Sequence, residues 1–304
     1  MEAINRIEFL DSFYPKAALA PRPRVPFSVI ALRWYFQTLG RLSPRLSGHL
    51  AYKLFTTPNK RAKHRSSDML LEQARIFEFL YGGHLLKAYE WGQGDRVILL
   101  VHGWESRGTA LRSFVPPLLR RGYRVVAFDG PAHGNSGGKR TNLPHFGGAI
   151  RALINRIGGV SGIIAHSFGG ASTMFTLANL DNSITVEKMV MIGVPGSLKN
   201  VLSQFSGYLH IPQSISNQVA RIVERKINGP LDEAHVGKIS ERAKVGQTLI
   251  IHDKMDNIVP FTEAENNIQH WEKAQLLVTE GYGHYKLMKN PDVVSRVVNF
   301  LTID

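Results

Sequence analysis

Short apolar runs alternate with longer stretches of helical periodicity from residue 96 to the end of the chain. An apolar run bounded by turn residues is typical of a buried strand, and helices between such strands are typical of βαβ units. The pattern therefore predicts a mostly parallel sheet flanked by helices. The predicted strands span 96–102, 123–129, 160–166, 187–193, 247–253 and 275–281, and the predicted helices 107–121, 144–157, 168–180, 261–272 and 290–302.

Three further patterns set the expected domain organisation. Residues 75–91 alternate apolar and polar around two glycines, which predicts a β-hairpin. Prolines punctuate the chain up to Pro26 and again at Pro44 and Pro58, so helices are expected over 27–40 and 44–56. More than 50 residues without a strand pattern follow Gly193, which we interpret as a cap over a site. The expected parts are a helical N-terminal extension (1–68), an α/β core (69–193 and 247–304) and a helical cap insertion (194–246).

The composition and the absence of certain motifs argue against several kinds of catalytic and cofactor site. The chain has 304 residues, 43% of them hydrophobic, and no cysteine. Without cysteine there is no disulfide, no thiolate nucleophile and no iron–sulfur cluster. There is no H-E-x-x-H motif, and the glycine-rich stretch 134–140 does not have the spacing of a phosphate-binding P-loop. We therefore expect neither a metal nor a cofactor.

The positive charge is concentrated near the N-terminus. The formal net charge is +13, and residues 1–65 hold 12 Lys or Arg against three acids. This basic stretch could pack against the core, attach peripherally to an anionic membrane through residues 27–65, or contact nucleic acid; no nucleic-acid-binding motif accompanies the charge, so nucleic acid is not expected. Early acids such as Glu2 and Glu8 do not fit a secretory signal, so the expected location is cytoplasmic, either free or at a membrane surface.

Polar residues at predicted strand ends carry the chemistry, because ligands of α/β sheets bind at the carboxyl ends of the strands. Ser167 stands in Ala165-His166-Ser167-Phe168-Gly169, between an apolar run and a helical pattern. This is the nucleophile elbow G-x-S-x-G with Ala165 in place of the first glycine. The sharp turn from strand to helix needs small residues two positions either side of the serine, which alanine and glycine both provide.

Two later strand ends supply an imidazole and a carboxylate. His284 follows the last predicted strand and a bend with Gly281 and Gly283, and an imidazole is suited to shuttle protons near neutral pH. Asp256 is the preferred carboxylate to orient this imidazole, and Asp253 is the alternative, with a turn-capping role of its own. The order serine, aspartate, histidine is the order of the α/β-hydrolase type of site.

A serine nucleophile also needs donors for the negative oxygen that develops during attack. One is the amide of Phe168, at the predicted start of a helix. The second is the amide of Trp104, in the loop after strand 96–102, where Gly103 allows close approach of the backbone. His102 is interpreted as a buried, hydrogen-bonded support of this loop.

Taken together, these motifs resemble the α/β-hydrolase superfamily, in its serine hydrolase branch of esterases and lipases. The matching segments are LLVHGW (99–104), FDGPAHGNS (128–136), AHSFGG (165–170), HDKMDNIVP (252–260) and GYGH (281–284). The resemblance implies Ser167 as nucleophile, His284 as acid and base, Asp256 as its orienting carboxylate, and an oxyanion hole of Trp104 and Phe168. It offers no role for the basic N-terminal stretch.

The expected activity is hydrolysis of a carboxylic ester or thioester through an acyl-enzyme on Ser167, without a cofactor. An acyltransferase or thioesterase would use the same residues, because only the second acceptor or the leaving group differs. A catalytically idle binding protein of the same fold is the alternative from a different class.

Overall fold

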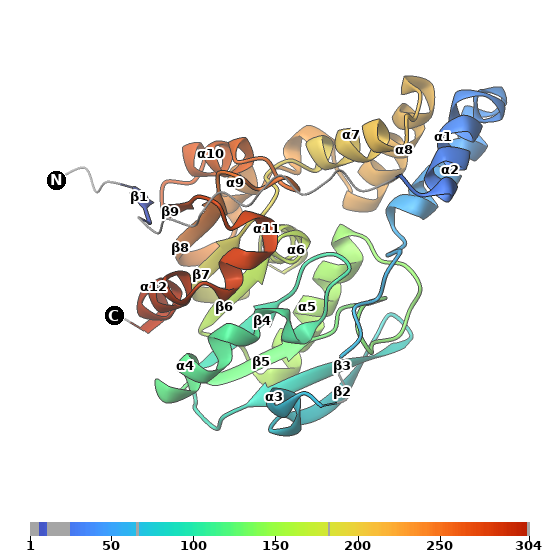
Figure 1. Ribbon diagram of the computed structural model, residues 1–304. Coiled ribbons are helices and arrows are strands. Elements are labelled where there is room, and N and C mark those ends of the chain that lie inside the picture. Colours follow the sequence, from blue (N-terminus) through green and yellow to red (C-terminus); the bar gives the residue numbers. More distant parts are fainter. Residues whose placement is uncertain (1–5, 11–24, 65–66, 182, 303–304) are drawn as a thin grey trace. The chain divides into compact units, whose positions relative to one another are not determined.

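The computed structural model describes residues 6–10, 25–64, 67–181 and 183–302 (Figure 1). The chain divides into two compact units. The first comprises Met1–Pro15, Pro58–Gly196 and Val236–Asp304, and the second Lys16–Thr57 and Ser197–His235.

The first unit is built on a single sheet of nine strands within the described residues. Its order is β1-β9-β8-β7-β6-β4-β5-β3-β2, and neighbours are parallel except where the hairpin β2–β3 joins β5 antiparallel. The strands are β1 (Ile7–Phe9), β2 (Arg75–Tyr81), β3 (His84–Trp91), β4 (Val97–Val101), β5 (Arg124–Phe128), β6 (Gly162–His166), β7 (Thr185–Ile192), β8 (Lys244–Asp253) and β9 (Ala274–Thr279). The predicted α/β class with a mostly parallel central sheet is confirmed.

Helices cover both faces of this sheet, because the side chains of the central strands alternate between two cores. In β4, Leu99 belongs to one core, and its neighbours Ile98 and Leu100 belong to the other. The first core includes residues of α5 (Leu143–Ile157), α6 (Phe168–Phe175), α9 (Val236–Ile239) and α10 (Thr262–Gln269). The second includes residues of α4 (Val115–Arg120) and α12 (Pro291–Thr302). The short helices α3 (Met69–Glu72) and α11 (Gly283–Lys286) complete this unit.

The second unit is helical and has a hydrophobic core of its own. It contains α1 (Phe27–Gln37), a 3₁₀ turn (Leu39–Leu42), α2 (Pro44–Phe55), α7 (Leu198–Tyr208) and α8 (Gln213–Ile227). Helices α2 and α8 approach closely at Gly48, where an added Cβ would lie 2.5 Å from Cβ of Gln218. Buried residues such as Phe36, Ala51 and Val219 join the two chain segments of this unit into one core.

The structure differs from the expected elements in three places. The short strand β1 was not predicted; its register with Leu276–Val278 of β9 pairs residues far apart in the chain. The segment expected as one helix over 107–121 is a 3₁₀ stretch (Gly108–Phe114) followed by α4. The units also divide the chain differently from the expected parts 1–68 and 194–246. Residues 58–64 and 236–246 belong to the first unit, while 16–57 and 197–235 form the second together.

None of the helices in the described part of the chain combines the length and the apolar character needed to cross a bilayer.

Candidate active site

Ser167 lies at the turn between β6 and α6 in a backbone conformation that non-glycine residues rarely adopt, with φ 52° and ψ −127°. An added Cβ at Gly169 would collide with the carbonyl oxygen of His102, and one at Gly170 would collide with the side chain of Val194. The backbone around the serine is therefore packed too tightly for larger residues, as a nucleophile elbow requires. The serine itself is half-buried.

The structure brings Ser167, His284 and Asp256 together from three strand ends. Nε2 of His284 lies 3.0 Å from Oγ of Ser167, and Nδ1 of His284 lies 2.6 Å from Oδ2 of Asp256. The hydroxyl can donate to Nε2 while Nδ1–H donates to the carboxylate. Both His284 and Asp256 are buried, so these hydrogen bonds are shielded from competing water.

The carboxylate of Asp256 is held in its ionised form. Burial alone would raise its pKa, but the hydrogen bond from His284 and the amides of Val259 and Ile258 outweigh burial and lower the pKa below its usual value. The two amides donate to Oδ1 at 2.9 and 2.8 Å, which leaves Oδ2 for the imidazole. The turn after β8 therefore fixes both the charge and the direction of this carboxylate.

Asp253, the alternative carboxylate, has a different task. Its side chain accepts hydrogen bonds from the amide of Met255, the hydroxyl of Thr279, and the amides of Gly281 and Tyr282, at 2.8–3.2 Å. These bonds join the end of β8 to the loop that follows β9. Asp253 thus supports the loop that leads to His284, and Asp256 is the residue that contacts the imidazole.

The loop after β4 passes directly against the serine. An added Cβ at Gly103 would lie 3.0 Å from Cβ of Ser167, so glycine allows this close approach. The predicted support by His102 is present in the structure: this buried ring donates from Nδ1 to the carbonyl of Gly103 at 2.7 Å and accepts from the amide of Gly130 at 2.9 Å. Neutral imidazole satisfies both bonds, and burial lowers the pKa of His102 accordingly.

Trp104 and Phe168, the two predicted amide donors, lie side by side, with ring centroids 5.2 Å apart in an edge-to-face arrangement. Within the described residues, neither amide donates a hydrogen bond to another protein group. Phe168 is the first residue of α6, where amides lack partners inside the helix. These amides are therefore free to bind a negative oxygen.

Two residues next to the imidazole were not assigned a role from the sequence. The buried ring of His166 donates from Nε2 to the carbonyl of His284 at 3.0 Å, and burial lowers its pKa to about 3, so it stays neutral. Gly193 has φ 57°, and an added Cβ there would lie 3.2 Å from the ring of His284 and 3.4 Å from Asp256. Two signals in the sequence could have revealed them: His166 is a polar residue at the end of a buried strand, and Gly193 directly follows the next strand.

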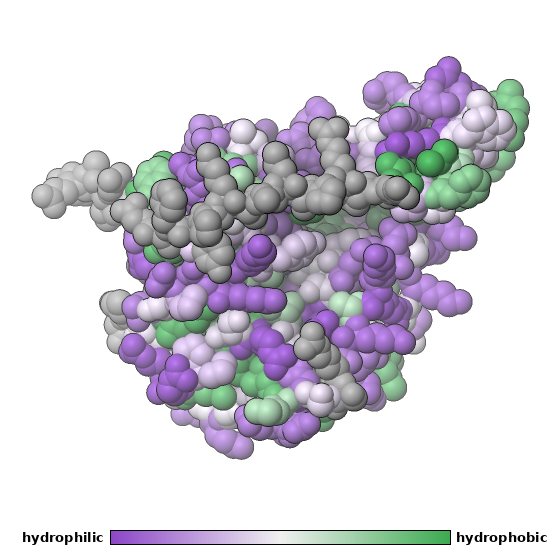
Figure 2. Space-filling view, in the orientation of Figure 1, coloured by the Kyte–Doolittle hydropathy of each residue, from purple (hydrophilic) through white to green (hydrophobic). Residues whose placement is uncertain are grey.

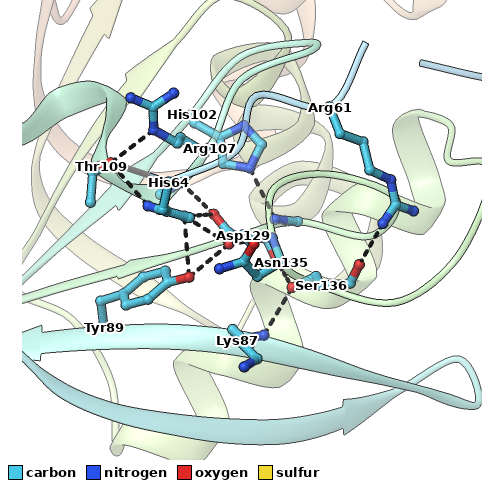
Figure 3. A network of polar contacts seen from close by, with 12 residues as sticks. Arg61, His64, Lys87, Tyr89, His102, Arg107, Thr109, Asp129, Asn135 and Ser136 are labelled. Atoms are coloured by element: carbon cyan, nitrogen blue, oxygen red, sulfur yellow. Dashed lines mark hydrogen bonds and ion pairs between the residues drawn. The ribbon is translucent and has the colours of Figure 1, made fainter. Parts of the chain in front are cut away.

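A buried polar network supports the same end of the sheet from the side of β5 (Figure 3). Asp129, directly after β5, accepts hydrogen bonds from the amides of Gly108 and Asn135 and from the hydroxyl of Tyr89, at 2.7–2.8 Å. Nε2 of His64 lies 3.0 Å from both carboxylate oxygens. Asp129 therefore joins the loop after β4 to the segment 58–64, which precedes β2.

Residues 58–64 contact other parts of the first unit at several points. Arg61 donates to the carbonyls of Ser136 and Gly138, and Oε1 of Glu105 accepts from the amide of Asn59 at 2.6 Å. Because Glu105 directly follows Trp104, this segment is tied to the loop that carries a predicted oxyanion donor. Part of the basic cluster at 60–65 thus binds the core, while Arg65 lies outside the described residues.

The model of the alpha/beta hydrolase family matches residues 98–297, a range that includes every residue described around Ser167 except the segment 58–64 and Tyr89. The chain belongs to the alpha/beta hydrolase family. Its strand order and the position of Ser167 after β6 agree with this membership.

Proteins similar to this chain have different named activities. It is 32% identical to a non-heme haloperoxidase of Rhodococcus erythropolis, over 68% of this chain and 91% of that protein. It is 25% identical to a 2-hydroxy-6-oxo-6-(2'-aminophenyl)hexa-2,4-dienoic acid hydrolase of Metapseudomonas resinovorans, over 76% and 92%. Among solved structures, an esterase of Pyrococcus furiosus shares the fold, with a TM-score of 0.57, 20% identity, and coverage of 81% of this chain and 96% of the esterase.

In the part of the chain that the structure describes, no three His, Asp or Glu side chains are grouped so that they could bind one ion.

Proposed function

We propose that this hydrolase cleaves a carboxylic ester through an acyl-enzyme on Ser167. The observation that carries the proposal is the continuous relay from Oγ of Ser167 through the imidazole of His284 to the carboxylate of Asp256, with distances of 3.0 and 2.6 Å. A serine hydroxyl is a weak nucleophile unless an adjacent base removes its proton. The relay provides that base and a carboxylate to stabilise the imidazolium that forms.

The proposed reaction has two halves. Oγ of Ser167 attacks the ester carbonyl carbon while its proton passes to Nε2 of His284, and the carbonyl oxygen becomes negative. The amides of Trp104 and Phe168 bind this oxygen. The tetrahedral intermediate collapses, the bond to the alcohol breaks, and the imidazolium gives its proton to the departing alcohol oxygen. Water then attacks the acyl group by the same steps, releasing a carboxylic acid and restoring the serine hydroxyl.

A thioester would enter the same first half, because a thiolate replaces the alkoxide as leaving group and the residues required are unchanged. Serine at the nucleophile position does not suit the mechanisms that use an aspartate nucleophile in this superfamily. The proposal therefore concerns acyl groups, with the ester as the first substrate class to test.

The test combines a fluorophosphonate probe with a series of nitrophenyl esters from acetate to palmitate. Wild type is expected to react with the probe and to hydrolyse at least one ester, whereas Ser167→Ala should lose labelling and about 10⁴- to 10⁶-fold in turnover. The matched control is Ser183→Ala at an exposed serine, which should behave as wild type. Equal labelling of wild type and Ser167→Ala, or no labelling of folded wild type, would overturn the proposal.

A further inference from the structure

The second unit exposes large apolar side chains around α1 and the beginning of α2. Six of them are between 50% and 83% exposed, although the same unit has a well-packed core. These residues are Phe27, Ile30, Trp34, Leu39, Leu42 and Leu46. The space-filling view shows hydrophobic residues at the surface of α1 and α2 (Figure 2). Contiguous exposed apolar surface in a folded protein indicates a contact with another apolar phase.

The exposed side chains lie on a defined face of the helix. In α1, Phe27, Ile30 and Trp34 are spaced by three and four residues, so they share one face. Phe36 is fully buried and Leu32 is packed against the core of the second unit. The helix therefore has an apolar side that serves folding and a second apolar side that folding does not use.

The surroundings of this face are basic. Within the described residues 25–57 the chain contains four Lys or Arg residues and no Asp or Glu. On α2, the exposed side combines Leu46 with Arg45, His49 and Lys53. An apolar face bordered by cations and free of carboxylates is typical of a helix that lies on an anionic membrane.

A basic groove lies beside α2 in the same unit. Its volume is about 920 Å³, and three arginines line it: Arg45 from α2, and Arg221 and Arg225 from α8. Among the described residues, no carboxylate lies within ion-pair distance of these arginines. The acid in the groove, Glu224, accepts a hydrogen bond from the amide of Leu231 at 3.3 Å. Nε of Arg225 donates to the carbonyl of Arg221 at 3.3 Å, and the remaining donors of the three guanidinium groups are available to an anion.

We propose that the second unit docks on an anionic phospholipid bilayer. The exposed side chains of α1 and of residues 39–46 enter the boundary between headgroups and acyl chains, and the groove arginines bind headgroup phosphates. Arginine forms paired, charge-assisted hydrogen bonds with phosphate oxygens, which suits this task. Trp34 is 62% exposed, and tryptophan is favoured at the membrane interface. This docking does not depend on the proposed reaction at Ser167.

Charge and composition together favour a bilayer over other occupants. A second copy of the chain would bring the same basic surface against itself, which is electrostatically unfavourable. A nucleic acid would bind the arginines but leave the six apolar side chains in water. An anionic bilayer can bind the arginines through phosphates at its surface and bury the apolar side chains in the hydrocarbon beneath.

The apolar half of the proposal is tested by sedimentation of the full chain with phosphatidylcholine vesicles, with and without phosphatidylserine. Wild type should sediment with the anionic vesicles. The double variant Phe27→Glu, Leu42→Glu should lose at least about tenfold in partitioning, because two charges replace apolar side chains that the proposal places in the bilayer. The matched control is Leu80→Glu, a leucine 71% exposed on β2 of the first unit, which should partition as wild type. Equal partitioning of the double variant and wild type would overturn the proposal.

The basic half is tested by replacing Arg45, Arg221 and Arg225 with glutamine. Each neutralised arginine should weaken binding to anionic vesicles about fivefold. The control replaces Arg120 and Arg121, exposed at the end of α4, with glutamine and should change binding less. Unchanged binding of the triple variant would overturn the headgroup assignment, as would equal wild-type binding to vesicles with and without phosphatidylserine.

Two further measurements separate this proposal from its alternatives. Ser167→Ala should bind vesicles as wild type does, so a failed activity assay leaves the docking result intact. If Phe27→Glu, Leu42→Glu converts a dimer to a monomer while vesicle binding is absent in both proteins, the face joins two copies of the chain and the proposal is wrong.

Discussion

The two units place polar and apolar side chains in opposite ways. In the first, the polar residues around Ser167 are buried and fixed by several hydrogen bonds each; Asp253 and Asp129 accept four or more. In the second, large apolar residues such as Phe27 and Leu42 are exposed beyond a core that is already complete. Buried polar groups are costly unless paired, and exposed apolar groups gain from burial. This difference is consistent with the two roles proposed above, bond cleavage at the buried site of the first unit and docking through the exposed surface of the second.

The largest expected effect separates two neighbouring carboxylates of the first unit. Asp256→Asn should lower turnover about 10⁴-fold, because the amide cannot stabilise the imidazolium of His284 or hold its reactive tautomer. Asp253→Asn should lower stability and keep turnover of the folded protein within about tenfold, because Asp253 supports a loop. Ester hydrolysis and thermal unfolding of both variants measure this. The reverse pattern would assign the orienting role to Asp253.

The buried network around Asp129 predicts a pH-dependent stability. Burial alone would raise the pKa of Asp129, but the hydrogen bonds from His64, Asn135 and Gly108 outweigh it, so the folded pKa lies below the usual value. A lowered carboxyl pKa adds stability that is complete above about pH 4 and is lost as the pH falls through the folded pKa. Asp129→Asn should therefore cost about 2 kcal/mol or more at pH 7.

The difference in melting temperature between wild type and Asp129→Asn should shrink as the pH is lowered below about 4. Exposed Asp95→Asn is the control and should differ little from wild type at any pH. A difference that stays constant down to pH 3 would show that the charge of Asp129 is not what stabilises the network.

The packing of the second unit predicts opposite effects of one substitution at two glycines. Gly48→Ala should destabilise this unit by about 1–2 kcal/mol, because the added Cβ lies 2.5 Å from Cβ of Gln218. Gly207→Ala on α7 should stabilise it by about 0.5–1 kcal/mol, because alanine favours helix and no atom lies within 4 Å of the new Cβ. The protection of α2 and α8 amides from hydrogen exchange measures the stability change in each variant. Equal protection in the two variants would contradict the close approach of these helices.

The smallest expected effect on activity comes from the hydrogen bond that joins residues 58–64 to the loop of Trp104. Glu105→Ala removes the acceptor for the amide of Asn59 and should lower kcat about three- to tenfold with KM unchanged, since the loop loses one fixed point. Glu105→Gln keeps an oxygen acceptor and should restore part of the rate. The control is Glu78→Ala at an exposed position on β2. A change in KM alone would place Glu105 in substrate binding instead.

The local pattern of apolar and polar residues was sufficient to predict most strands of the sheet and the polar residues that follow them. The six predicted strands and the hairpin at 75–91 are present, because apolar alternation records burial residue by residue. The elbow at Ser167 could be predicted because its small neighbours are dictated by contacts within a few residues. The local pattern favoured Asp256 over Asp253, although both stand in the same turn. The tertiary structure separates their contacts, because Nδ1 of His284 lies 2.6 Å from Oδ2 of Asp256, a residue 28 positions earlier in the chain.

The sequence by itself determined the fold class and the residue types that gather at one edge of the sheet, because parallel strands bring their carboxyl ends together. The tertiary structure decided which segments pack as one body. Residues 16–57 join 197–235, β1 joins β9, and His64 reaches Asp129. Such pairings depend on the shapes of surfaces that meet only after folding, and periodicity along the chain carries no record of a distant partner.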